Sequence, residues 1–148
     1  MSLITVLESV ALVSASIYAG ATYYVAAVEQ PSRPGAPAGL DLEAWRRAND
    51  RAPRYAASAL VRAGAGLIAG WEALHRWPWI LGAFLLLAVL PWTVLAMLPI
   101  QRRLDETRTT SADPKARRLV ERWGRLHLGR LALGLGALAL FLEGMLQR

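Results

Sequence analysis

Four long apolar runs constrain this chain more than any other feature of its sequence. Each is near or above the roughly 20 residues that a helix needs to cross a bilayer core. They cover Leu3–Val28, Tyr55–Leu74, Trp77–Ile100 and Leu126–Leu142. The first run is too long for a signal peptide and no positive segment precedes it, so we expect a retained helix. The sequence therefore predicts an all-α fold, a four-helix transmembrane bundle formed by a single integral-membrane domain over residues 1–148.

The charge of the chain is concentrated beside these runs. The net charge is +6, and its basic residues gather in the first loop and in the third loop with the start of the fourth helix. These are Arg33, Arg46, Arg47, Arg51 and Arg54, and then Arg102, Arg103, Arg108, Lys115, Arg117, Arg118, Arg122 and Arg125. We expect them to set orientation and to meet membrane lipids, with no role for nucleic acid. Both loops then face the cytoplasm, which places both termini of this multi-pass cell-membrane protein outside it.

Prolines and glycines predict the shape of the connections. The first loop opens with a stretch rich in both, and helical patterning resumes at Leu40–Asp50, where we expect a short interfacial helix with Trp45 directed inward. Pro91 should kink the third helix and Pro99 should end it. The fourth helix should begin at the cap Asp113-Pro114.

The last apolar run carries a polar face. Trp123, His127 and Arg130 are spaced by four and three residues, so on a helix they fall within roughly 60° of one another. The same stripe includes Leu119, Gly134, Ala137 and Phe141. Charged and polar side chains are costly in a membrane helix and tend to face the bundle interior, so this face is a candidate functional site. Arg62 in the second run lies at a similar depth.

Each of these residues also has a structural interpretation. Histidine titrates near neutral pH, which suits a general base, but an interfacial His127 satisfied by a backbone carbonyl is the alternative. Arg130 has the forked donors to hold an enolate or phenolate; its alternatives are snorkelling and an ion pair with Glu29 or Asp50. Trp123 can anchor the helix at the membrane interface, where tryptophan is common, or it can stack on a ligand.

Metal and haem chemistry find little support in the sequence. The chain has no cysteine, which excludes disulfides, thiolate ligands and a cysteine nucleophile. Its two histidines, His75 and His127, belong to opposite membrane faces, and no histidine–carboxylate cluster occurs. We therefore expect no metal and no resident cofactor.

Several segments together resemble a family of small integral-membrane proteins whose characterised members include anthrone oxygenases of aromatic polyketide pathways. The resemblance rests on Leu98–Leu104 (LPIQRRL), Trp123–Arg130 (WGRLHLGR), Leu90–Thr93 (LPWT), Glu29–Pro31 (EQP), Trp45 and Arg51. Similar proteins often have Pro-Thr-Asn at Pro99-Ile100-Gln101 and a tyrosine at the position of Asn49, so the substrate here is open.

The resemblance implies cofactor-independent oxygenation of a lipophilic aromatic substrate, as by a monooxygenase. It implies catalytic roles for His127 and Arg130, and substrate-binding roles for Trp123, Arg62, Trp45, Arg51 and Trp92. The other hypothesis is a non-catalytic four-helix membrane protein that acts as a structural or partner-docking component. The oligomeric state is open under either hypothesis, and a homo-oligomer is compatible with both.

Overall fold

The computed structural model describes residues 3–32, 47, 77–106 and 114–147, which are almost entirely helical and contain no strand. The first helical stretch consists of α1 (Leu3–Tyr24), a π-helical turn η1 (Val25–Glu29) and α2 (Gln30–Ser32). The second consists of α5 (Trp77–Trp92), a π-helical turn η3 (Thr93–Met97) and α6 (Leu98–Glu106), and the third is α7 (Pro114–Leu146). The all-helical prediction is confirmed for these parts of the chain.

Three of the helical stretches are long and apolar enough to cross a membrane. They cover Leu3–Glu29, Trp77–Glu106 and Pro114–Leu146, with 27, 30 and 33 residues. At the rise of an α-helix the shortest is about 40 Å long, which exceeds a bilayer core of about 30 Å. The predicted second helix, Tyr55–Leu74, lies outside the described residues. So does the predicted interfacial helix Leu40–Asp50, apart from Arg47, which is helical and exposed.

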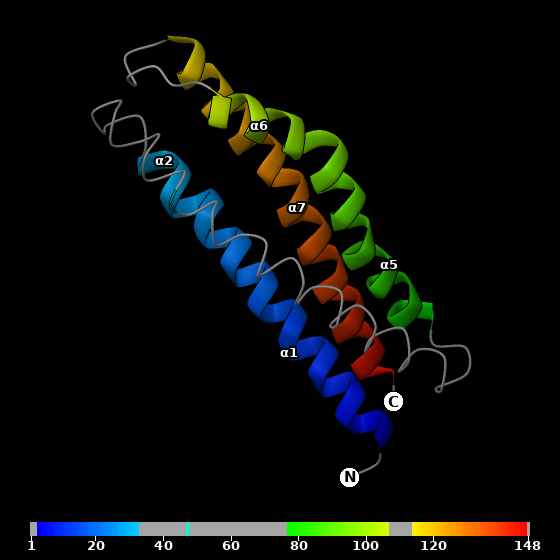
Figure 1. The fold of residues 1–148 in the computed structure, drawn as a ribbon. Helices are drawn as coiled ribbons and strands as arrows, with labels where there is room; N and C mark the ends of the chain where they lie inside the picture. Colours follow the sequence, from blue (N-terminus) through cyan, green and yellow to red (C-terminus); the bar gives the residue numbers. More distant parts are fainter. Residues whose placement is uncertain (1–2, 33–46, 48–76, 107–113, 148) are drawn as a thin grey trace.

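The long helix α7 lies between α1 and α5 and contacts both of them (Figure 1). α1 and α5 run in the same direction and α7 runs against them, so the start of α1 and the end of α7 lie at the same end of the molecule (Figure 1). The helix α7 begins at Pro114, as the Asp113-Pro114 pattern predicts.

Small residues hold the three helices together near the start of α1. The buried cluster there contains Ala11 and Ala15 of α1, Trp79 and Ala83 of α5, and Ala137 and Phe141 of α7, all without exposed surface. The rings of Trp79 and Phe141 stack with their centroids 4.9 Å apart. Close approach through alanine and glycine is the usual way in which helices associate in lipid.

A proline that was expected to end a helix does not do so. The helical stretch continues through Pro99 to Glu106, so that prediction is wrong. Pro99 is the second residue of α6, immediately after the π-helical turn η3. A proline within a helix removes one backbone hydrogen bond, which can kink the helix without ending it.

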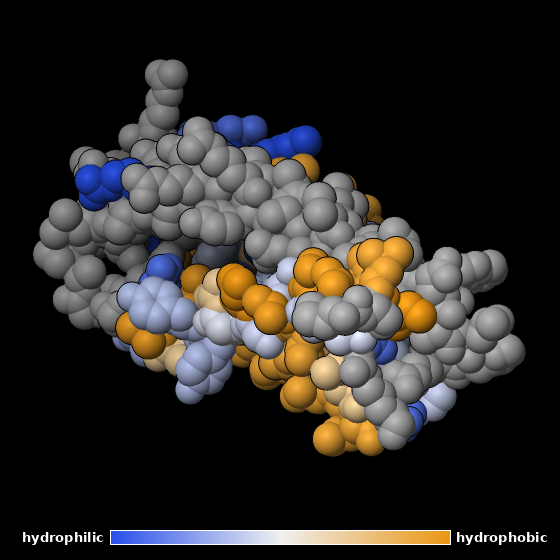
Figure 2. Space-filling view, turned by 90° about the horizontal axis from the view of Figure 1, so that it is seen from below, coloured by the Kyte–Doolittle hydropathy of each residue, from blue (hydrophilic) through white to orange (hydrophobic). Residues whose placement is uncertain are grey.

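Much of the outer surface formed by the described helices is apolar. Large hydrophobic side chains are exposed on all three long helices, for example Ile17, Phe84, Leu95 and Leu135. Figure 2 shows that hydrophobic residues make up most of the described middle of the face in view. An exterior of this kind suits lipid rather than water. The described part of the chain therefore has the construction of a membrane protein.

Candidate functional site

The polar face predicted on the last helix is buried in the bundle. Trp123 and His127 retain only 7% and 4% of their surface, and their rings stack with centroids 5.2 Å apart and 27° between the planes. Further along the same stripe Gly134, Ala137 and Phe141 are buried too. The stacking fixes the imidazole against the indole, so the histidine is held in one orientation on the inner face of α7.

Arg130 crosses from α7 to the first helix. Its Nε donates a hydrogen bond of 3.2 Å to the hydroxyl oxygen of Tyr18, and its guanidinium carbon lies 5.8 Å from the centre of the Tyr18 ring. That distance is within the range of a cation–π contact. The predicted alternative of an ion pair with Glu29 is not found between these two described residues, and Asp50 lies outside the described part of the chain.

Gly134 makes room for the tyrosine. A Cβ at this position would lie 2.9 Å from Tyr18 ring atoms, so any larger residue would push the ring away from α7. Tyr18 therefore occupies a notch between Arg130 and Gly134, and the arginine, the tyrosine and the glycine form one unit. Tyr18 is not among the site residues that the sequence predicts. Its position in the middle of an apolar helix, too deep for an interfacial anchor, is the signal that was available.

Trp92 braces α5 against α7. Its indole N–H donates a 3.0 Å hydrogen bond to the backbone carbonyl of Leu126, and a Cβ at Gly129 would lie 2.4 Å from the indole ring. The tryptophan thus contacts the α7 backbone at Leu126 and Gly129, on either side of His127 in the sequence. With its N–H engaged by a carbonyl, Trp92 offers a ring face rather than a donor to any ligand.

Two π-helical turns flank this part of α7, and both contact it. In η1 the N–H of Gln30 bonds to the carbonyl of Val25, and in η3 the N–H of Leu98 bonds to that of Thr93. Such one-turn π segments are rare and occur frequently at functional sites. Sequence reasoning did not predict them. Met97, which ends η3, packs with Trp123 in a second buried cluster, so η3 helps to position the tryptophan beneath His127.

Three of the predicted site residues, Trp45, Arg51 and Arg62, lie outside the described residues, so their convergence with His127 and Arg130 stays a prediction. Gln101, where similar proteins often have asparagine, is half-buried at the start of α6. Within residues 3–32, 77–106 and 114–147 no group of three or more histidine, aspartate or glutamate side chains is placed to hold a metal ion.

Comparison with known protein families gives a match. The family model described as anthrone oxygenase matches residues 42–140, which is well over half of the chain and includes Trp92 and the stretch from Trp123 to Arg130. No curated protein and no solved structure matches the chain. Tyr18 and Gln30 precede the matched segment.

Proposed function

The chain belongs to the anthrone oxygenase family, and from that premise we propose that it oxygenates a lipophilic, anthrone-type aromatic substrate without a resident cofactor. The observation that carries the proposal is the pairing on α7 of a buried histidine with an arginine one turn away. His127 is stacked on Trp123, and Arg130 is held by Tyr18. A base and a cation at this spacing on one helix are the two groups that the chemistry requires.

The proposed reaction needs molecular oxygen as its only co-reactant. An anthrone has a methylene carbon between two aromatic rings, and removal of one of its protons gives an enolate that shares its charge between this carbon and the carbonyl oxygen. Oxygen accepts two electrons from the carbanion in one-electron steps and forms a C–O bond, and protonation gives a hydroperoxide. Loss of the second methylene proton with cleavage of the O–O bond leaves a carbonyl. One anthrone and one O₂ thus give one anthraquinone and one water.

In this proposal His127 takes the methylene proton and returns it to the peroxide. Arg130 and Tyr18 stabilise the enolate oxygen. Among the described residues, the only hydrogen bond of the Arg130 side chain is the one from Nε, so its terminal N–H groups can face a substrate. The Tyr18 oxygen accepts that bond, and its O–H proton can be donated to a second oxygen. Trp123 supplies a flat wall behind the imidazole.

The structural hypothesis has its own supporting observation. The Arg130–Tyr18 bond joins α7 to α1, and the Trp92–Leu126 bond joins α7 to α5. Polar contacts of this kind act as glue between membrane helices. On this hypothesis the polar face would serve assembly alone, and the bundle would act as a scaffold or docking component.

Oxygen uptake distinguishes the two functions. Purified full-length protein in detergent micelles, given an anthrone, should consume one O₂ per anthrone and form the anthraquinone, measured by an oxygen electrode and mass spectrometry. Heat-denatured protein in the same micelles corrects for spontaneous oxidation, and a chelator tests for adventitious metal. Rates equal to those of the denatured control across a series of anthrones would reject the oxygenase and leave the scaffold.

Removal of the Arg130 guanidinium should lower turnover more than removal of the Tyr18 hydroxyl. Arg130→Ala is expected to lower kcat on the order of 100-fold, the usual cost of one oxyanion donor. Arg130→Lys keeps the charge without the planar fork, so its loss should be smaller. Tyr18→Phe keeps the ring against the guanidinium and removes the hydroxyl, so we expect a loss below roughly tenfold. If Arg130→Lys were as inactive as Arg130→Ala, charge stabilisation of an enolate would be the wrong role.

We also propose four membrane spans with both termini outside the cytoplasm. The parallel direction of α1 and α5 (Figure 1) and the basic residues of the two loops support this arrangement. A reporter that works only outside the cytoplasm should be active when fused after Arg148. A reporter that works only in the cytoplasm should be active when inserted within 108–115. Activity of a cytoplasmic reporter fused after Arg148 would show that the topology is the reverse of the proposed one.

A further inference from the structure

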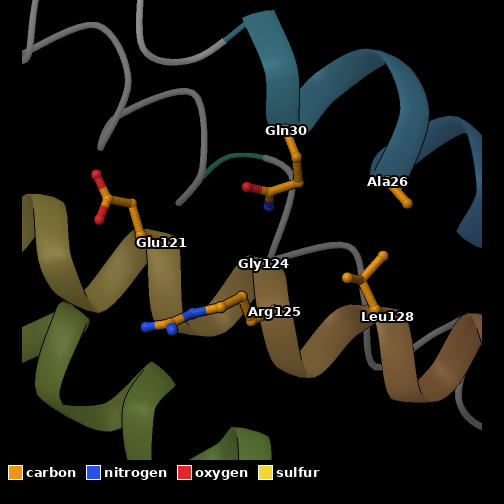
Figure 3. A pocket seen from close by; sticks show the side chains of 6 residues that line it. All are labelled: Ala26, Gln30, Glu121, Gly124, Arg125 and Leu128. Carbon is orange, nitrogen blue, oxygen red and sulfur yellow. The ribbon is translucent and has the colours of Figure 1, made fainter.

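A pocket lies between the end of the first helix and α7, away from the face that carries His127. Figure 3 shows its lining residues, with Ala26 and Gln30 above and residues of α7 below. Among the described residues the lining consists of Ala26, Gln30, Glu121, Gly124, Arg125 and Leu128, around a cavity of about 360 Å³. This volume falls at the lower end of the range for small-molecule sites. It suits a small polar group better than a polycyclic aromatic.

A glycine on α7 admits the polar side chain that forms the roof of this pocket. A Cβ at Gly124 would lie 2.5 Å from Gln30 Oε1, so the carboxamide fits only because the glycine has no side chain. The Gln30 Nε2 is buried and finds no acceptor among the described residues. Since a buried donor without an acceptor is costly, a ligand oxygen at this point would be favoured.

The mouth of the pocket carries one cation and one anion. Arg125 forms no ion pair with any residue of the described ranges. Glu121 is bonded to Arg117 at 3.4 Å, but both side chains are about three-fifths exposed, at 58% and 62%, so this pair is weak. In Figure 3 the Glu121 carboxylate and the Arg125 guanidinium both extend to the end of the pocket away from Leu128, and the carboxylate points outward from Gln30. One end of the pocket lining thus carries an anion and a cation, the two charges that a zwitterion would match.

The depth of the pocket identifies the source of such a zwitterion. Along α7 the charged residues Arg122 and Arg125 give way to the apolar run that begins at Leu126, so the pocket lies at the level of lipid headgroups. Leu128, at the apolar side of the pocket, is 51% exposed. A molecule with its polar end in the pocket would extend an acyl chain over this leucine into the bilayer.

We propose that this pocket binds the headgroup of an ethanolamine-type phospholipid. The phosphate accepts hydrogen bonds from Gln30 Nε2 and the Arg125 guanidinium, and the primary ammonium donates to Glu121. Choline carries no N–H donor for the carboxylate, and the glycerol headgroup carries no cation. Both should therefore bind less well than ethanolamine with the same acyl chains.

Native mass spectrometry of the full-length protein in detergent tests the site. Titration with phosphatidylethanolamine, phosphatidylcholine and phosphatidylglycerol of equal chains should show binding at least about tenfold tighter for the first. The double variant Gln30→Leu/Arg125→Ala should lower the affinity for phosphatidylethanolamine to that for the other two lipids. Glu121→Gln should remove the preference for ethanolamine over choline. Arg122→Ala removes an exposed cation that does not line the pocket, so it should bind as the wild type does.

Two results would overturn the proposal. One is equal binding of the three lipids to the wild-type protein, or unchanged preference in the pocket variants while circular dichroism shows intact helices. The other is saturation by free phosphoethanolamine or inorganic phosphate at concentrations where the lipid does not bind, which would make this a soluble-anion site. The readout does not involve oxygenation, so it is independent of the proposed activity.

Discussion

His127→Ala is expected to lower anthrone turnover by at least about 100-fold, because a positioned general base contributes factors of this size or more. Histidine is the residue whose proton exchange is naturally set near neutral pH, and His127 is the only histidine on α7. Oxygen uptake at saturating anthrone gives kcat directly. A loss confined to kcat with unchanged KM would match a group that acts on the reacting proton rather than in binding.

A loss of folding would imitate this result, so a matched variant is needed. His127 is 4% exposed and stacked on Trp123 at 5.2 Å, and alanine there leaves a cavity. His127→Gln keeps a polar side chain of similar reach without a titrating group, and should be as inactive as alanine while it melts closer to the wild type. Wild-type uptake by His127→Gln in protein of normal helicity would reject the base role.

The inner face of α7 could be predicted from the sequence because a helix fixes the angular positions of its own residues. The spacing of Trp123, His127 and Arg130 placed them on the face that continues through Gly134, and Trp123, His127 and Gly134 are buried in the structure. Only the period of the helix is needed for this inference. The start of α7 at Pro114 follows from local capping chemistry in the same way.

The partner of Arg130 was not predictable on these grounds. A periodicity says which face a helix buries, but not which residue of another helix lies at the same depth, and Tyr18 is far away in the sequence. The notch at Gly134 that receives its ring depends on the relative height of α1 and α7. The sequence interpretation offered charged partners for Arg130, whereas the structure supplies a phenol.

The error at Pro99 has a different origin. A proline inside an α-helix normally removes a hydrogen bond and breaks the helix, and the prediction assumed a regular helix up to that point. In the structure the π-helical turn Thr93–Met97 precedes Pro99 closely, and the helix continues through the proline to Glu106. Single-turn π segments have no reliable sequence pattern, so the turn escaped prediction.

A large effect on stability is expected at the contact between Gly82 and Phe141. A Cβ at Gly82 would lie 2.6 Å from Phe141 Cε1 and 3.2 Å from the backbone oxygen of Ala137. The ring cannot retreat, because Phe141 has no exposed surface and is stacked on Trp79. Overpacking of this kind costs roughly 1–3 kcal/mol. Gly82→Ala should therefore lower the free energy of unfolding by about that amount, and Gly82→Leu by more.

A second glycine provides the control. Gly20 on α1 has nothing within 4 Å of the position of a Cβ, so Gly20→Ala should leave stability unchanged or raise it by up to about 1 kcal/mol through helix propensity. Unfolding in detergent, followed by circular dichroism, measures both. Equal shifts for the two variants would show that the loss reflects glycine in general and not the packing against Phe141.

A double variant then assigns the loss to the pair. Phe141→Leu removes the ring that meets the new methyl, so Gly82→Ala should cost less in that background than in the wild type, and the difference is the coupling between the two sites. Phe141 is 14 positions after His127, or about 21 Å along α7 at helical rise. Gly82→Ala protein that remains folded at low temperature should therefore retain wild-type oxygen uptake, which separates packing of the bundle from chemistry at His127.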